Sequence, residues 1–127
     1  MSQTILLVDD NAIQATTRRA ILQRTGRTVI VANGAPQALA MLDDPAFLKS
    51  IGLVMTDHLM PEMNGPEFVA ALRKRMPNAP VVVLSGFLDV EPEYEGLKVI
   101  FRAKPVPPDQ LISLTESLLP VTLTKTA

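Results

Sequence analysis

Five short apolar runs constrain the fold of this chain more than any other feature of its sequence. Most of their residues are Val, Ile or Leu, and turn or polar residues bound each run. Apolar runs of this length are typical of strands that are buried on both faces, as in a parallel sheet. The runs are Ile5–Val8, Thr28–Val31, Leu53–Met55, Val81–Leu84 and Val99–Phe101.

Segments with a helical period lie between these runs. The sequence predicts further helices that begin near Pro36, Pro66 and Pro108, because proline is well tolerated in a first helical turn. Strands that alternate with helices indicate right-handed βαβ units and one parallel sheet covered on both faces. The inward stripe of the first helix is predicted at Ile13, Thr17, Ala20, Ile21 and Arg24, before a stop at Gly26.

Length and composition favour one globular domain. With 127 residues, we expect a domain over residues 1–120 and a tail over residues 121–127. The hydrophobic fraction of 47% and the charged fraction of 20% suit a packed core. The absence of cysteine excludes disulfides and thiolate metal sites and fits a cytoplasmic location, while a net charge of -1 argues against nucleic-acid or membrane partners.

Polar residues follow four of the five runs, at the strand ends where open parallel sheets bind ligands. Asp9 and Asp10 follow the first run, Asp57 the third, Ser85 the fourth and Lys104 the fifth. Three clustered carboxylates repel one another unless a cation is present. Mg²⁺ is a suitable cation, because it is commonly coordinated by a few carboxylates together with waters. One carboxylate could then attack phosphorus to give an aspartyl phosphate, with the ammonium neutralising the phosphoryl oxygens. Singly, these residues also suit helix caps, turns or solvated charges.

Four segments of the chain resemble the response-regulator receiver family of two-component signalling. They are Ile5–Asn11, Val54–Gly65, Val81–Gly86 and Phe101–Pro105, of which the part from Asp57 to Gly65 is the most specific. The resemblance implies a flavodoxin-like α/β fold with a doubly wound, five-stranded parallel sheet in the order 2-1-3-4-5.

The resemblance also implies roles for individual residues. Asp57 is the expected phosphoacceptor, and Asp9, Asp10, Asp57 and the backbone carbonyl of Leu59 are the expected Mg²⁺ site. Ser85 and Lys104 are expected to contact the phosphoryl group. Phe101 matches the aromatic switch, for which a plain core aromatic is the alternative, and a cis peptide bond is expected before Pro105.

The segment from Ser85 to Lys104 departs from the family pattern. It is short and acidic, and Pro92 and Gly96 interrupt it, so we expect a shortened or irregular fourth helix. That helix belongs to the usual dimer face, so a monomer or weak dimer is expected. Leu59 and Phe87 are apolar where polar residues are frequent, and we expect them to slow hydrolysis of the aspartyl phosphate.

Expected partners are a histidine kinase or a histidine phosphotransfer protein, with the chain acting as a switch without an attached output domain. Such a switch catalyses only its own phosphorylation and dephosphorylation. A basic set on the first helix and its exit is interpreted as a solvated face that could also dock an acidic partner. The set comprises Arg18, Arg19, Arg24 and Arg27.

Two alternatives come from other functional classes. A haloacid-dehalogenase-type phosphatase or phosphotransferase needs Asp-x-Asp-x-Thr after the first strand, which Asp9–Ile13 does not match. A phosphorylation-independent interaction domain that keeps the receiver fold stays open.

Overall fold

The five predicted strands form one parallel sheet. The structure is a computed structural model that describes residues 3–119, so the predicted tail lies outside the described residues. The strand order β2-β1-β3-β4-β5 confirms the predicted flavodoxin-like fold. The strands are β1 (Thr4–Val8), β2 (Val29–Ala32), β3 (Ile51–Asp57), β4 (Val81–Ser85) and β5 (Ile100–Ala103).

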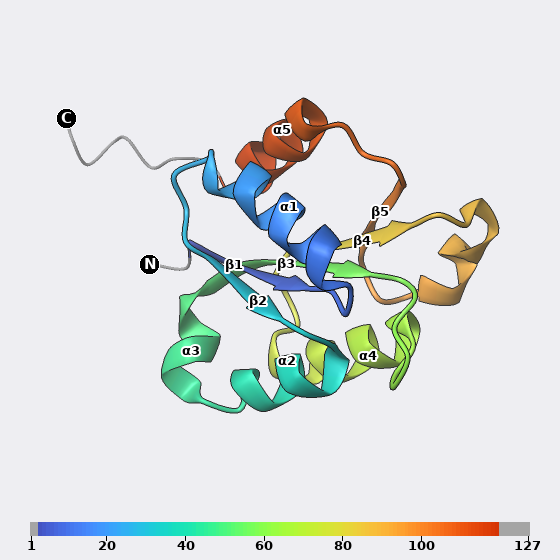
Figure 1. Ribbon diagram of the computed structural model, residues 1–127. Coiled ribbons are helices and arrows are strands. Elements are labelled where there is room, and N and C mark those ends of the chain that lie inside the picture. The colour runs from blue at the N-terminus through green and yellow to red at the C-terminus, as the bar shows by residue number, and fades with distance from the viewer. Residues whose placement is uncertain (1–2, 120–127) are drawn as a thin grey trace.

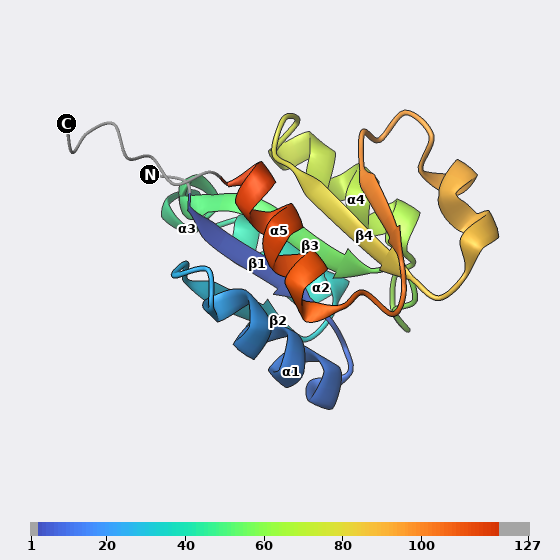
Figure 2. The ribbon, with the colours of Figure 1, turned by 90° about the horizontal axis from the view of Figure 1, so that it is seen from above.

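Helices cover both faces of this sheet. The helices α1 (Ala12–Gln23) and α5 (Pro108–Leu118) lie on one face (Figures 1 and 2). On the other face lie α2 (Ala35–Leu42), α3 (Pro45–Ser50) and α4 (Gly65–Arg75). The short α3, capped by the Asp44 carboxylate, is an addition to the predicted elements. Within the described residues, no helix is long and apolar enough to cross a membrane.

Alternate residues of each strand feed two separate cores. In β1, Ile5 and Leu7 pack with Leu22 and Leu111 beneath α1 and α5. Leu6 and Val8 pack on the opposite face, in the core that contains Phe68, Leu72 and other side chains of α2 and α4. The central strand β3 is buried along its whole length, which explains its continuous apolar sequence.

The predicted inward stripe of α1 is wrong. Ile13 is 81% exposed, whereas Ala15 and Leu22 are the buried residues of the helix. Gln14 and Arg18 are half-buried on the inward side. The helical spacing from the apolar Ile13 placed the stripe, but the first half of α1 passes over charged strand ends, where Gln14 and Arg18 find polar partners.

The arginines of this region are likewise not one solvated face. Arg27 is 7% exposed and donates hydrogen bonds to Gln3 Oε1 and to the backbone carbonyls of Thr25 and Leu119. Arg18 is also turned inward, while Arg19 and Arg24 are exposed as predicted. The expectation of a four-residue basic face therefore fails for half of its members.

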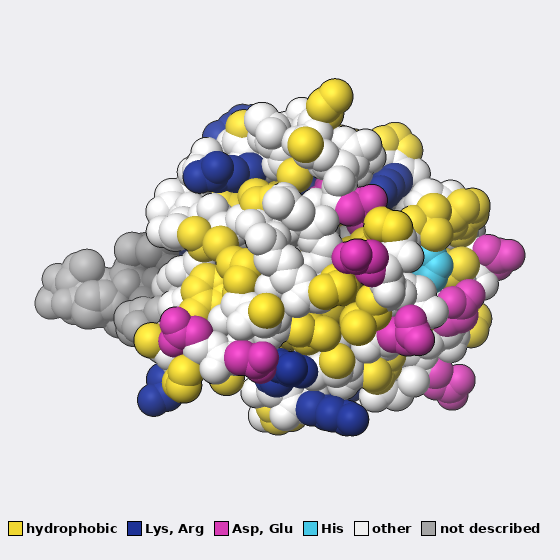
Figure 3. Space-filling view, turned by 60° about the horizontal axis from the view of Figure 1, so that its bottom comes forward, with side chains coloured by type: hydrophobic (Ala, Val, Ile, Leu, Met, Phe, Trp, Pro, Cys, Tyr) yellow, Lys and Arg dark blue, Asp and Glu magenta, His cyan; other side chains and the backbone are white. Residues whose placement is uncertain are grey.

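The expected irregular helix is the 3₁₀ segment η1 (Leu88–Tyr94). Its acidic residues and those beside it are exposed, and Figure 3 shows acidic side chains gathered at the end of the molecule where Figure 1 shows η1. Tyr94, at its end, is only 3% exposed. Beyond η1, the Arg73 guanidinium donates to the carbonyls of Leu97 (2.8 Å) and Lys98 (2.9 Å) and so fixes the approach to β5.

Candidate functional site

Three aspartates meet at the carboxyl ends of β1 and β3. Carboxylate oxygens of Asp9, Asp10 and Asp57 all lie within 4.8 Å of one another. Asp9 is 1% exposed and Asp57 is 3% exposed, while Asp10 faces solvent. The parallel sheet brings them together because β1 and β3 are paired in register up to Val8 and Thr56. We refer to these three residues as the acidic edge.

Two cationic side chains contact the acidic edge. Lys104 Nζ lies 2.8 Å from Asp57 Oδ1. The Arg18 guanidinium lies 3.0 Å from Asp9 Oδ2 and 3.2 Å from Asp57 Oδ1. Both buried carboxylates are therefore paired, as buried charges must be. The contact of Lys104 follows the predicted convergence, whereas the sequence analysis did not identify Arg18 as part of the site.

The acidic edge remains short of positive charge even with these two cations. Burial is the main cause that raises the pKa of Asp9 to about 7, and the neighbouring Asp57 carboxyl adds to the rise. The backbone N–H of Asn11, 2.9 Å from Asp9 Oδ1, and the charge of Arg18 act in the opposite direction. A carboxyl that holds its proton near neutral pH indicates that the site can accept more positive charge.

This donor set fits a hard divalent cation. Three carboxylates at one solvent-accessible edge, one of them exposed, are ligands that Mg²⁺ accepts together with waters. Arg18 already places a cationic group between Asp9 and Asp57. Asp9, Asp10 and Asp57 would hold the metal, while the role of the Leu59 carbonyl stays a prediction.

Ser85 lies beside the acidic edge at the end of β4 and is 2% exposed. Its hydroxyl donates to the carbonyl of Phe87 (3.1 Å) and accepts from the N–H of Phe87 (2.9 Å). The backbone N–H of Lys104 donates to the carbonyl of Ser85 (2.7 Å), which ties β4 to the loop after β5. The Lys104–Pro105 peptide bond is cis.

An aromatic group links the loop after β3 to η1. His58 Nδ1 and the Tyr94 hydroxyl are 2.7 Å apart, and both residues are buried. The Tyr94 ring lies 6.0 Å from that of Phe101, the predicted aromatic switch, which is half-buried against the α2 and α4 core. The sequence analysis missed this link because His58 and Tyr94 are 36 positions apart in the chain and no local pattern pairs them.

Gly65 makes room for this aromatic group at the start of α4. A Cβ atom at Gly65 would overlap the Tyr94 hydroxyl and lie 2.9 Å from its Cζ. The N–H of Gly65 also donates to the carbonyl of His58 (3.2 Å). The glycine is therefore required by the close approach of Tyr94.

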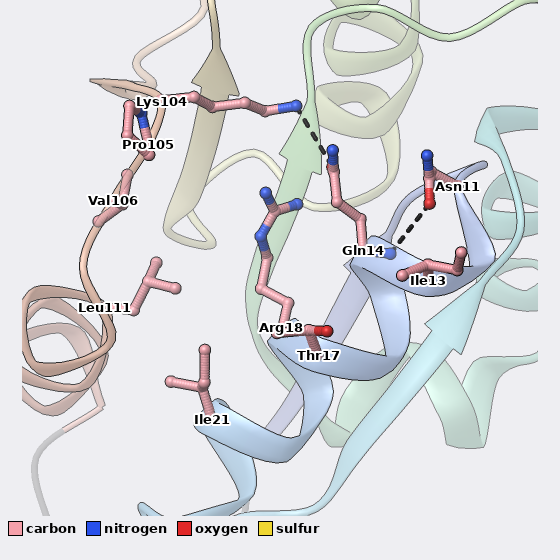
Figure 4. Close-up of a pocket in the computed structure, with 10 residues that line it drawn as sticks. All are labelled: Asn11, Ile13, Gln14, Thr17, Arg18, Ile21, Lys104, Pro105, Val106 and Leu111. Carbon is pink, nitrogen blue, oxygen red and sulfur yellow. Dashed lines mark hydrogen bonds between the residues drawn. The ribbon is translucent and has the colours of Figure 1, made fainter.

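A cavity of about 660 Å³ opens beside the acidic edge, between α1 and the loop that leads into α5. Figure 4 shows Gln14 and Arg18 pointing from α1 toward the same region as Lys104. The Lys104 ammonium donates to Gln14 Oε1 at 3.4 Å. Thr17, Ile21 and Leu111 form the less polar part of the wall.

The sequence profile of the response regulator receiver domain matches residues 5–116. This chain belongs to the response regulator receiver family. The receiver region is similar to solved structures as well. A response regulator receiver protein from Pseudomonas putida is 30% identical, with a TM-score of 0.80 over 92% of this chain and 98% of that one. The receiver domain of the Francisella response regulator 1452 is 26% identical, with a TM-score of 0.78 over 98% and 99%.

Curated relatives of this receiver are longer proteins. The transcriptional regulatory protein ZraR of Klebsiella oxytoca is 32% identical over 118 residues, which cover 90% of this chain and 26% of the relative. The transcriptional regulatory protein CpxR of Escherichia coli K12 is 40% identical over 81 residues, or 64% of this chain and 32% of the relative. The chain thus matches about a quarter to a third of their length.

Proposed function

We propose that this receiver is a phosphoacceptor module of a two-component phosphorelay in which Asp57 takes a phosphoryl group from a phosphohistidine. One observation carries the proposal: the buried Asp57 carboxylate ends β3 between Asp9, Asp10 and the Lys104 ammonium. The donor is a histidine kinase or a histidine phosphotransfer protein, and the reaction takes place in the cytoplasm. Phosphorylation changes a protein-interaction surface.

In the reaction, an Asp57 oxygen forms a bond to phosphorus as the phosphorus–nitrogen bond of the donor breaks. The bonding electron pair stays on the imidazole nitrogen, and the imidazole leaves neutral when its other nitrogen carries a proton. Lys104, 2.8 Å from Asp57 Oδ1, is placed to neutralise an incoming phosphoryl oxygen. Asp9, Asp10 and Asp57 would hold Mg²⁺, which would supply further positive charge near these oxygens.

Ser85 and Phe101 are proposed to report the phosphorylated state. The Ser85 hydroxyl is engaged with the backbone of Phe87, so a contact with the phosphoryl group requires that turn to open. Phe101 lies on β5 opposite Val83 of β4, two residues before Ser85 in the chain. A movement of Ser85 therefore reaches the aromatic ring through adjacent strands.

Phosphoryl uptake tests this proposal directly. The chain is incubated with Mg²⁺ and acetyl phosphate, and the mass of the intact protein is measured. We expect the gain of one phosphoryl group in the wild type and none in Asp57→Asn. Asp43→Asn, which alters an exposed carboxylate, serves as the matched control and should behave like the wild type.

One observation favours the alternative, a phosphorylation-independent interaction domain. Arg18 already pairs with Asp9 and Asp57, as a structural ion pair would. In that case acetyl phosphate would not phosphorylate the wild type at any Mg²⁺ concentration. Beryllofluoride would not bind to it either, as measured by fluorine NMR.

A further inference from the structure

Arg18 joins Asp9 and Asp57, two of the residues that would hold a metal ion. One guanidinium nitrogen contacts both carboxylates, at 3.0 and 3.2 Å. Its side chain is 13% exposed, and the two carboxylates are 1% and 4% exposed. The contact is therefore a buried ion pair rather than a solvated one, and breaking it without a replacement cation would leave buried charges uncompensated.

The positions of the two cations differ in a way that matters for metal binding. Lys104 contacts Asp57 Oδ1 and Gln14 Oε1. Arg18 contacts the same Asp57 Oδ1 and, in addition, Asp9 Oδ2, so it joins two carboxylates of the metal-ligand set. A divalent cation held by those carboxylates would be a like charge close to the guanidinium and would repel it.

We propose that Arg18 is a built-in counter-cation that a divalent metal must displace from Asp9 and Asp57, and that it thereby sets the metal affinity of this receiver. The inference rests on the proposed function, since it concerns the same acidic edge. When ionised, the three carboxylates carry one more negative charge than the two basic groups neutralise, so metal binding is still favoured. The free energy of metal binding then includes the cost of breaking the Arg18 contacts.

The cavity beside α1 gives the displaced side chain a place to go. Arg18 is itself part of its wall, together with Thr17 and Ile21 of the same helix (Figure 4). The guanidinium can leave Asp9 by rotation of its own side chain, with α1 unmoved. Metal binding and the position of Arg18 are therefore coupled locally.

Mg²⁺ titration by isothermal calorimetry tests this inference without any phosphoryl transfer. We expect Arg18→Gln to bind Mg²⁺ more tightly than the wild type, on the order of ten-fold, the range in which neighbours of metal ligands act. Arg19→Gln removes the same charge from an exposed position of the same helix and should match the wild type. Equal or weaker binding by Arg18→Gln would overturn the inference.

A second measurement uses the wild-type protein and does not depend on how the variant folds. The Arg18 Nε–H signal in a nitrogen–proton NMR spectrum, assigned with Arg18→Lys, should shift with the same midpoint as the calorimetric titration. An unchanged Arg18 signal at saturating Mg²⁺ overturns the inference while leaving the proposed function intact. Failure of both wild type and variant to bind Mg²⁺ overturns both.

Discussion

The acidic edge and the η1 segment lie at the same end of the sheet but are held by opposite kinds of interaction. At the edge, two buried carboxylates are paired with Arg18 and Lys104. In η1, the acidic residues and Pro92 face solvent, and Tyr94 is the buried anchor. Charge pairing thus fixes one region, and the packing of one aromatic ring fixes the other.

The difference shows which changes each region tolerates. A buried carboxylate that loses its partner carries the full cost of an unpaired charge, so the edge depends on every member. The exposed acidic residues of η1 should tolerate substitution, whereas its buried anchor Tyr94 should not. The three predictions that follow test this contrast.

The largest effect is expected from Gly65→Ala, which disrupts the packing of Tyr94, the anchor of η1. The added Cβ would overlap the Tyr94 hydroxyl, so the ring must move or be expelled. We expect the free energy of unfolding to fall by about 3 kcal/mol, at the upper end of overpacking effects. Urea denaturation followed by circular dichroism measures it.

Gly86→Ala is the matched control, because a Cβ at Gly86 meets no atom within 4 Å. This substitution should change the free energy of unfolding by no more than about 0.5 kcal/mol. Tyr94→Phe removes the hydroxyl that the Gly65→Ala methyl would overlap, so the double variant should be more stable than Gly65→Ala alone. Additive losses would show that Tyr94 does not explain the glycine.

A smaller effect is expected from pH at the acidic edge of the metal-free protein. The pKa of Asp9 rises from 3.8 to about 7 on folding, so the folded state binds the extra proton between these values. Stability from this group therefore falls as pH increases through that window. In EDTA, we expect Tm to fall by a few degrees between pH 5 and pH 7.5.

Asp9→Asn isolates this contribution, since the amide cannot titrate. The slope of Tm against pH should become flatter in the variant by the amount that Asp9 supplies. An identical slope in the two proteins would show that the burial of Asp9 does not govern the pH dependence.

The smallest effect is expected at the rim of the acidic edge, where Leu59 is 63% exposed and Phe87 is 49% exposed. If these apolar side chains exclude attacking water from the phosphorylated Asp57, the double variant Leu59→Asn, Phe87→Gln should lose phosphate a few-fold faster. This corresponds to a decrease of less than about 1.4 kcal/mol in the activation free energy of hydrolysis. Loss of the phosphoryl group is followed by mass after removal of acetyl phosphate. An unchanged or slower rate contradicts the expectation, and Ile13→Gln, an exposed apolar residue on α1, is the control.

The sheet and the acidic edge could be predicted because each depends on short, local signals. Buried parallel strands need continuous apolar runs, and parallel pairing brings their carboxyl ends to one edge regardless of loop details. Asp9, Asp10 and Asp57 therefore converge whenever the strand assignments are right. Only the boundaries moved, as in β3, which extends the predicted Leu53–Met55 to Ile51–Asp57.

Arg18 and Tyr94 could not be found in this way because their partners are distant in sequence. Gln14 and Arg18 are one helical turn apart and share the face toward the strand ends, a polar stripe that an apolar stripe search passes over. Tyr94 meets His58 across 36 positions of the chain. The exposed acidic run around Tyr94 gives no local sign that this residue is buried.

Arg73 and Tyr94 together fix the far end of the connection between β4 and β5, while Ser85 fixes its beginning. The residues between these points form an arc that is clamped at both ends. Such an arc can be rewritten in sequence, or exchanged for a foreign peptide, without disturbing the acidic edge. A receiver of this design can therefore acquire a new recognition loop while its acidic edge stays as it was.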